Sequence, residues 1–327
     1  MDPLCQAVEA AWQAGIVVVV AAGNQGRNNN GGIGGYGTIT APGNDPYVIT
    51  VGAMKAMNTP ARGDDRIASY SSKGPTLYDH IVKPDLVAPG NQVISSVLYY
   101  QSGIYTAYPT TQIACGVYVG SSGAYNCANV AQYYYRLSGT SMATPVVSGA
   151  AALLIQQNPA LSPDQVKARL MKTAYKSFPT ASVATDPSTG ASYTSYYDMF
   201  TVGAGYLDIQ AALANTELAT KPALSPAAVF DPKTNQVSVV GGANVVWGSN
   251  VVWGSNVVWG SNVVWGSSVL SASNVVWGSN VVWGSSAMQG FNVVWGSGTN
   301  GTIDPANVVW GSGGVLEGAA VLTMGEN

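Results

Sequence analysis

Histidine and charged residues are scarce in this chain of 327 residues. Charged side chains make up 9% of it, against about 25% in ordinary globular proteins, and there is a single histidine. The net charge is −3, and the 13 basic residues form no stripe along the sequence. Because binding to a phosphate backbone requires such a basic footprint, we expect no nucleic-acid partner.

Cysteines are also few. Cys5, Cys115 and Cys127 lack the C-x-x-C spacing that is typical of zinc sites. Cys115 and Cys127 are close enough to join one loop by a disulfide, which would contribute about 3 kcal/mol of stability. The sequence leaves this disulfide and a pair of free thiols equally open.

No hydrophobic run is long. The longest, residues 14–23, is about half of what a membrane-spanning helix needs, so we expect no membrane span and interpret the run as a buried strand. Met1 leads directly into Asp2 and Pro3, without the basic and apolar regions of a secretory signal. We therefore expect no signal peptide within this chain.

The chain is rich in hydrophobic residues, at 47%, which is enough for a packed core. Before Gly241, β-branched apolar runs alternate with helical patterns, which predicts an α/β fold with a doubly wound, mostly parallel sheet. A strand is expected over residues 16–22. Three helix starts are expected from capping signals: Asp2 with Pro3, ending at Gly15; Ser162 with Gln165, running to about Ala174; and Asp208, running through Ala214.

The end of the chain has a different composition, with no basic residue and only 3 of the 16 acidic ones after Gly241. The unit N-V-V-W-G-S occurs eight times there and holds eight of the nine tryptophans. The copies predict either a stacked ladder or solenoid, or an irregular segment prone to β-association, which their uneven spacing favours. We expect a body over residues 1–220, a linker over 221–243 and a repeat tail over 244–327. The copies begin at Asn244, Asn250, Asn256, Asn262, Asn274, Asn280, Asn292 and Asn307.

The strongest chemical signal is G-T-S-M-A-T-P at residues 139–145, which precedes a stretch, 146–155, that is apolar nearly all round. We expect this stretch to form a buried helix, whose N-terminus offers unpaired backbone N–H groups and a positive dipole end to an oxyanion formed at Ser141. An isolated serine in this position is more often a simple N-cap. The motif nevertheless makes Ser141 a candidate nucleophile for acyl transfer.

A second signal, A-A-G-N at residues 21–24, ends the expected strand and leads into a loop rich in Asn and Gly. Loops that leave the carboxyl ends of parallel strands are where α/β sheets build their sites. The Asn24 amide could donate to the same oxyanion as the Ser141 N–H. An asparagine of this kind is, on its own, more often a turn residue.

Together, and in this order, the two segments resemble the subtilisin-like serine proteases, whose nucleophile motif is G-T-S-M-A-x-P and whose oxyanion asparagine ends an A-A-G-N strand. Residues 70–75, 83–90 and 203–208 are similar to further family segments in the family's order. The resemblance covers about residues 3–215.

This resemblance implies a serine endopeptidase that acts on peptide or protein substrates, is secreted, and requires no cofactor. Ser141 would be the nucleophile, and Asn24 would form the oxyanion hole together with the Ser141 amide. By the same likeness, the substrate-binding residues would be Ala21, Ala22 and Gly23, which would line the primary specificity pocket, with Gly139 and Thr140.

The resemblance does not extend to the rest of the catalytic triad. No D-[ST]-G or H-G-T-H motif is present, and the one histidine, His80, follows Asn24 where the family's histidine precedes it. We expect His80 to lie in a solvated loop, and the chain to correspond to the carboxyl two-thirds of a catalytic domain, with an incomplete fold. Because losing triad members costs about 10⁴ to 10⁶ in turnover, the chain alone should be inactive. The alternative is a non-catalytic structural or adhesive product that carries the tryptophan tail.

Two weaker signals remain. Residues 32–37 fit G-x-G-x-x-G, but the segment that follows, 38–42, suits no helix, so we interpret the motif as a loop and not as a dinucleotide site. The turn at residues 43–46 resembles a place where the family holds a weak structural cation. A plain proline turn is the alternative.

Overall fold

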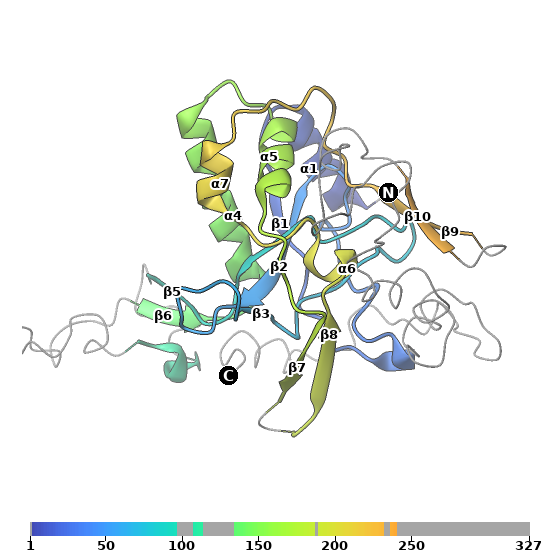
Figure 1. Ribbon diagram of the computed structural model, residues 1–327, viewed down its shortest axis with the longest axis vertical. Helices are drawn as coiled ribbons and strands as arrows, with labels where there is room; N and C mark the ends of the chain where they lie inside the picture. Colours follow the sequence, from blue (N-terminus) through green and yellow to red (C-terminus); the bar gives the residue numbers. More distant parts are fainter. Residues whose placement is uncertain (1, 97–106, 114–133, 187–188, 232–235, 241–327) are drawn as a thin grey trace, which may run out of the picture.

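The computed structural model describes residues 2–96, 107–113, 134–186, 189–231 and 236–240 (Figure 1). The repeat tail, Cys115 and Cys127 lie outside these residues, so the predictions for them stay predictions. The described elements are α1 (Pro3–Gln13), β1 (Val19–Ala21), η1 (Asn30–Gly32), β2 (Ile49–Lys55), β3 (Arg66–Ile67), β4 (Leu86–Pro89), β5 (Val93–Ser96), η2 (Pro109–Thr111), β6 (Tyr134–Leu137), α4 (Thr140–Gln157), α5 (Pro163–Thr173), β7 (Ala181–Thr185), β8 (Ser192–Tyr196), α6 (Met199–Val202), α7 (Ile209–Ala214), β9 (Ala227–Asp231) and β10 (Gln236–Val240).

A parallel sheet lies at the centre of the fold. Strand β2 pairs in parallel with β1 on one side and with β4 on the other, and Val51 faces both Ala21 and Leu86. The short strand β3 pairs antiparallel with the end of β2, on the side of β1. Six of the seven residues of β2 are buried, as expected for a strand with neighbours on both sides. The predicted α/β fold is therefore confirmed.

The capping signals mark the helix starts correctly. The Asp2 carboxylate accepts a hydrogen bond from the Leu4 N–H at the start of α1. Ser162 and Gln165 exchange the two hydrogen bonds of a capping box at the start of α5. The Asp208 carboxylate accepts from the Ala211 N–H and opens α7. Each signal acts within one helical turn, so no distant contact is needed to satisfy it.

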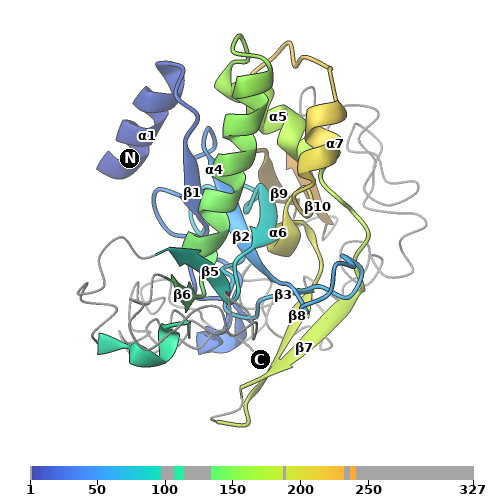
Figure 2. The same ribbon diagram turned by 90° about the vertical axis from the view of Figure 1, so that its left-hand side faces the viewer.

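Helix α4 lies across one face of the sheet and contacts β1, β2 and β4. In Figure 2, α1 lies to one side of α4, and α5 and α7, which both contact α4, lie to its other side. Helix α4 starts at Thr140, before the expected apolar stretch, so Ser141 lies in its first turn. The stretch is apolar nearly all round, but the helix is not covered on every side, and Leu153 is 42% exposed. The expectation that this helix is wholly buried is therefore wrong.

The first strand also differs from its prediction. It spans Val19–Ala21 and not residues 16–22, and its three residues are half-buried. Within the described part of the chain, β1 pairs with β2 alone, so its other edge has no partner strand. Ile16, at the start of the expected strand, is 58% exposed.

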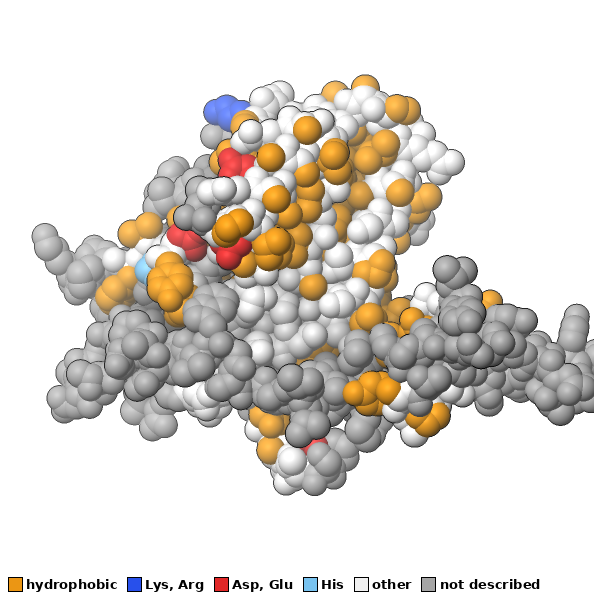
Figure 3. Space-filling view, turned by 180° about the vertical axis from the view of Figure 1, so that it is seen from behind, with side chains coloured by type: hydrophobic (Ala, Val, Ile, Leu, Met, Phe, Trp, Pro, Cys, Tyr) orange, Lys and Arg blue, Asp and Glu red, His pale blue; other side chains and the backbone are white. Residues whose placement is uncertain are grey.

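Figure 3 shows hydrophobic side chains gathered on the lobe that contains the helices, with few charged ones among them.

Part of the expected linker is packed against the body. Ala223 and Ala228 are buried, and the Ala223 N–H donates to Asp164 of α5. The Val82 N–H donates to the carbonyl of Pro226. Residues 221–231 thus continue the body of the fold, because their backbone groups bond to it, and β9 pairs with β10 as a hairpin.

Candidate active site

The N-terminus of α4 lies at the carboxyl ends of the parallel strands. Just after β4, the Gly90 carbonyl accepts a hydrogen bond of 2.8 Å from the Gly139 N–H. Just after β1, the Ala22 N–H still bonds to Val51, and Asn24 follows two residues later. The sheet therefore brings together Asn24 and the first turn of α4, which are 116 residues apart in sequence.

Hydrogen bonds join the two segments directly. The Oδ1 atom of Asn24 accepts from the Thr140 backbone N–H at 2.9 Å and from the Thr140 hydroxyl at 3.1 Å. The Gly23 N–H in turn donates to the Thr140 hydroxyl at 3.1 Å. These bonds use the oxygen of the Asn24 amide and leave its two N–H donors for other partners.

Ser141 is exposed, and it is the second residue of α4. Its backbone N–H is one of the first four of the helix, which have no intrahelical acceptor. The nearby Gly139 carbonyl accepts from Met142 and Ala143 instead. An exposed hydroxyl, an unpaired N–H and the positive end of an 18-residue helix therefore coincide at Ser141.

The expected substrate-binding residues are close to this point but are not equally accessible. Ala22 and Thr140 are fully buried, whereas Ala21 and Gly23 are half-buried. The Gly23 carbonyl accepts a hydrogen bond of 2.9 Å from the Ser72 N–H. The Thr140 hydroxyl bonds to Asn24 and Gly23, so Thr140 positions these residues. The sequence did not indicate this role, for which the only signal is that Thr140 precedes Ser141 in the motif. Direct substrate contact by these residues stays a prediction.

Gly139 has a backbone conformation that favours glycine. Its φ is +146°, a region that side chains rarely adopt. A Cβ at this position would lie 3.3 Å from Asn24 Nδ2. Glycine therefore lets the chain pass close beside the Asn24 amide as it enters α4.

His80 lies away from Ser141. His80 comes before the amino end of β4 in the sequence. The start of α4, which contains Ser141, is bonded to Gly90 just after the carboxyl end of β4, so the two residues lie at opposite ends of the sheet. His80 lies in a loop, as expected, and is half-buried; its carbonyl accepts a hydrogen bond from the Ala228 N–H of β9. Burial lowers its pKa, while Asp79 acts in the opposite direction. The structure gives His80 no route to act as a base for Ser141.

The turn at residues 43–46 does not fit a free metal ion as it is folded. The Gly43 carbonyl accepts a hydrogen bond from the Thr50 hydroxyl at 2.7 Å. The Pro46 carbonyl accepts from the Lys167 ammonium at 2.8 Å and from the Ser225 N–H at 2.9 Å. Protein donors thus already use two of its four carbonyls. The described residues contain no cluster of three or more His, Cys, Asp or Glu side chains placed to hold a metal.

The fold and this site define an α/β protein with a serine and an asparagine amide at one helix N-terminus, the arrangement of an oxyanion hole. Residues 1–205 match the family model described as Peptidase_S8, the Subtilase family. The chain therefore belongs to the subtilase family. None of the helices in the described ranges is long and apolar enough to cross a membrane.

Individual proteins are similar to parts of this chain. Serine protease AprX of Bacillus subtilis (strain 168) is 45% identical over 166 residues, which are 51% of this chain and 32% of that protein. Subtilisin DY of Bacillus licheniformis is 32% identical over 209 residues, 64% of this chain and 51% of that protein. The crystal structure of fervidolysin from Fervidobacterium pennivorans, a keratinolytic enzyme related to subtilisin, matches with a TM-score of 0.42 and 25% identity, over 71% of this chain and 28% of fervidolysin. The matched residues thus cover about a third of AprX and about half of subtilisin DY.

Proposed function

We propose that this chain is the nucleophile-bearing part, the carboxyl two-thirds, of the catalytic domain of a subtilisin-like serine endopeptidase that is secreted or extracellular and acts on peptide and protein substrates. One observation carries the proposal: Thr140 holds the oxygen of the Asn24 amide at 2.9 Å beside the exposed Ser141. Membership of the subtilase family supports it. The division into a peptidase body, a linker and a repeat tail belongs to the same proposal, with the body extended to residue 231 by the contacts of residues 221–231.

In the proposed reaction, Ser141 Oγ attacks the carbonyl carbon of the substrate peptide, and the carbonyl oxygen becomes an oxyanion. The Ser141 N–H and an Asn24 Nδ2–H donate to that oxyanion, which lowers the barrier. The hydroxyl proton moves to a histidine that this chain does not supply. That histidine passes it to the leaving amine, and water then hydrolyses the acyl-enzyme in a second, equivalent step.

The proposal is tested with casein as substrate. We expect the chain as it stands to show no Ser141-dependent hydrolysis. Joining it behind a relative's segment that contains D-[ST]-G and H-G-T-H should yield hydrolysis that Ser141→Ala abolishes. A joined protein that is folded but inactive would contradict the proposed nucleophile, and Ser141-dependent hydrolysis by the chain alone would contradict the proposed inactivity.

A second candidate is a non-catalytic structural or adhesive product. The observation that favours it is the position of His80, the sole histidine, at the opposite end of the sheet from Ser141. This candidate predicts that the joined protein gains no activity, although it folds. It also predicts that the chain self-associates, that removing residues 244–327 abolishes this association, and that Ser141→Ala leaves it unchanged.

A further inference from the structure

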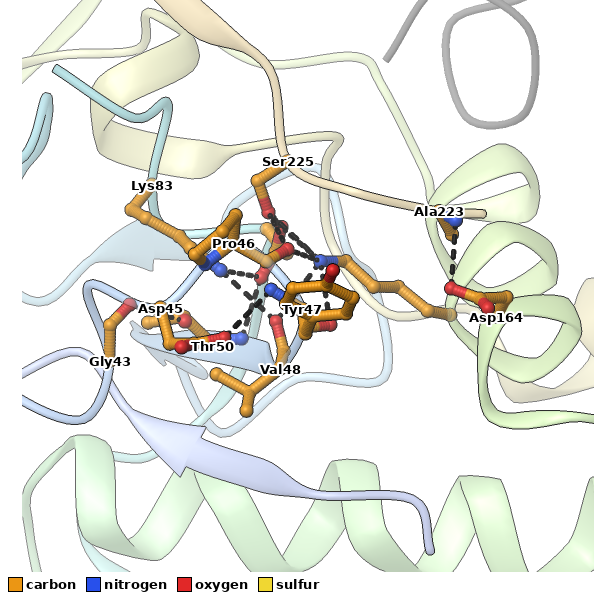
Figure 4. A network of polar contacts seen from close by, with 12 residues as sticks. Gly43, Asp45, Pro46, Tyr47, Val48, Thr50, Lys83, Asp164, Ala223 and Ser225 are labelled. Carbon is orange, nitrogen blue, oxygen red and sulfur yellow. Dashed lines mark hydrogen bonds and ion pairs between the residues drawn. The ribbon is translucent and has the colours of Figure 1, made fainter. Parts of the chain in front are cut away.

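Two lysines and one aspartate are buried together at the amino end of the sheet, away from the candidate active site (Figure 4). The Lys83 ammonium lies 2.7 Å from Asp85 Oδ2, and the Lys167 ammonium lies 3.3 Å from Asp85 Oδ1. All three side chains have no exposed surface. An isolated buried charge is very costly, so this cluster must satisfy its ions internally.

Lys167 reaches from α5 into a group of oxygen atoms. Figure 4 shows the carbonyls of this group converging at the start of β2. The Nζ atom of Lys167 lies close to five oxygens: Pro46 O at 2.8 Å, Ser225 Oγ at 2.9 Å, Val48 O at 3.0 Å, Tyr47 O at 3.1 Å and Asp85 Oδ1 at 3.3 Å.

This number of neighbours exceeds what an ammonium group needs. A lysine has three N–H donors, so it cannot give each of the five oxygens a bond of its own. A shell of three backbone carbonyls, a carboxylate and a hydroxyl is typical of the ligands that hard metal cations take. The group, which we call the oxygen cage, is therefore built as a cation site.

The charges around the oxygen cage are consistent with this interpretation. Burial alone would raise the pKa of Asp85, but Lys167 and Lys83 outweigh burial and hold that pKa below its usual value. Burial lowers the pKa of Lys167 to about 7, with Asp85 opposing and Lys83 reinforcing the fall. Below that pH the oxygen cage contains an ammonium ion.

We propose that the oxygen cage is a cation site that the chain fills with its own Lys167 ammonium, in place of a bound metal ion. The internal cation fastens α5, the start of β2, the start of β4 and residue 225 to one another. The expected cation turn at residues 43–46 contributes Pro46 to this arrangement. The chain should accordingly gain nothing at this site from added cations, and a small cation should bind there only when the ammonium is removed.

Thermal unfolding of the full chain at pH 6 tests the proposal in NaCl, KCl and CaCl₂, against tetramethylammonium chloride at equal ionic strength. Lys167→Ala vacates the oxygen cage, and we expect one of the small cations to raise its midpoint by about 3–6 °C per tenfold increase in concentration. Lys167→Met refills the cage with an apolar chain of similar length and should show no such effect. If the Lys167→Ala chain is already unfolded in tetramethylammonium chloride, no unfolding midpoint can be measured there. The test then asks whether adding a small cation refolds the chain.

A Lys167→Ala chain that responds to no small cation, folded or not, would overturn the proposal. A second measurement uses the unaltered protein. With lysine labelled at ¹³Cε, the Lys167 resonance at pH 6 should have the chemical shift of an ammonium, identified by its loss in Lys167→Met. The shift of a neutral amine at that pH would show that no cation fills the oxygen cage.

Discussion

Thr140 fixes the orientation of the Asn24 amide. The Thr140 backbone N–H can only donate, so the Asn24 atom 2.9 Å away must be the oxygen. The Thr140 hydroxyl donates to the same oxygen and accepts from the Gly23 N–H, both at 3.1 Å. One buried side chain therefore links the end of β1 to the start of α4 and leaves Asn24 Nδ2 free to act as a donor.

Replacing Thr140 by valine should destabilise the chain by about 1–3 kcal/mol, because the substitution keeps the shape but leaves the Gly23 N–H without its acceptor. Urea unfolding measures the change as a lower midpoint. Thr140→Ser keeps the hydroxyl and serves as the control, with a smaller loss. If valine and serine variants unfold at the same midpoint, the hydroxyl does not tie the two segments together.

Removing the Asn24 donor should slow catalysis without weakening substrate binding. In the joined, active protein, Asn24→Leu should lower kcat roughly 10²–10³-fold with little change in KM, since the oxyanion exists only in the transition state. Asn30→Leu, an exposed residue of the same loop, is the matched control. An equal loss in both variants, or a loss confined to KM, would argue against an oxyanion hole at Asn24.

Two glycines of the same region should respond to alanine with opposite signs. Gly139→Ala should destabilise the chain by about 1–3 kcal/mol, because φ is +146° and the added Cβ meets Asn24 Nδ2. Gly149 lies inside α4, where a Cβ would meet nothing within 4 Å. Gly149→Ala should therefore stabilise it by roughly 0.5–1 kcal/mol. Chemical denaturation of both variants checks the signs, and stabilisation by Gly139→Ala would show that its conformation is not strained.

The sequence predicted the features that local physical chemistry determines. The helix starts at Asp2, Ser162 and Asp208 are satisfied within one turn, so their composition is sufficient to locate them. The family motifs correctly placed Asn24 beside the start of α4. The 116 residues between them are bridged by the parallel sheet, which the alternation of strand and helix patterns predicted, whereas the family resemblance indicated which two segments meet there.

The features that the sequence did not reveal depend on long-range contacts. Nothing near Lys167 in sequence indicates that an amphipathic helix points this lysine into the oxygens of residues 46–48. The half-burial of β1 follows from which edge has a partner, and the exposure of Leu153 follows from which face of α4 is covered. Hydrophobicity alone could not distinguish these cases, because an apolar segment has the same composition whether or not a neighbour covers it.

We expect Lys176 to make the stability of the chain depend on pH. Burial lowers its pKa to about 7, although its ammonium donates to the carbonyls of Met171 and Ala204 at 3.1 and 2.5 Å. The unfolded chain keeps the ordinary value of about 10.4. Between these two values the unfolded state binds more protons than the folded state, so stability should rise as the pH increases from about 7 toward 10.

The slope should reach up to about 1.4 kcal/mol per pH unit for this group. Urea midpoints measured between pH 6 and 9 show it, and the Lys176→Met variant should lose this part of the slope because it has no proton to release. Lys221→Met, at an exposed position, is the control and should keep the slope of the unaltered chain. Since Lys167 also has a pKa lowered to about 7, Lys176→Met should retain a smaller rise with pH, and the variant that lacks both lysines should have a smaller slope than either single variant. A slope that Lys176→Met leaves unchanged would mean that this ammonium is not desolvated in the folded protein.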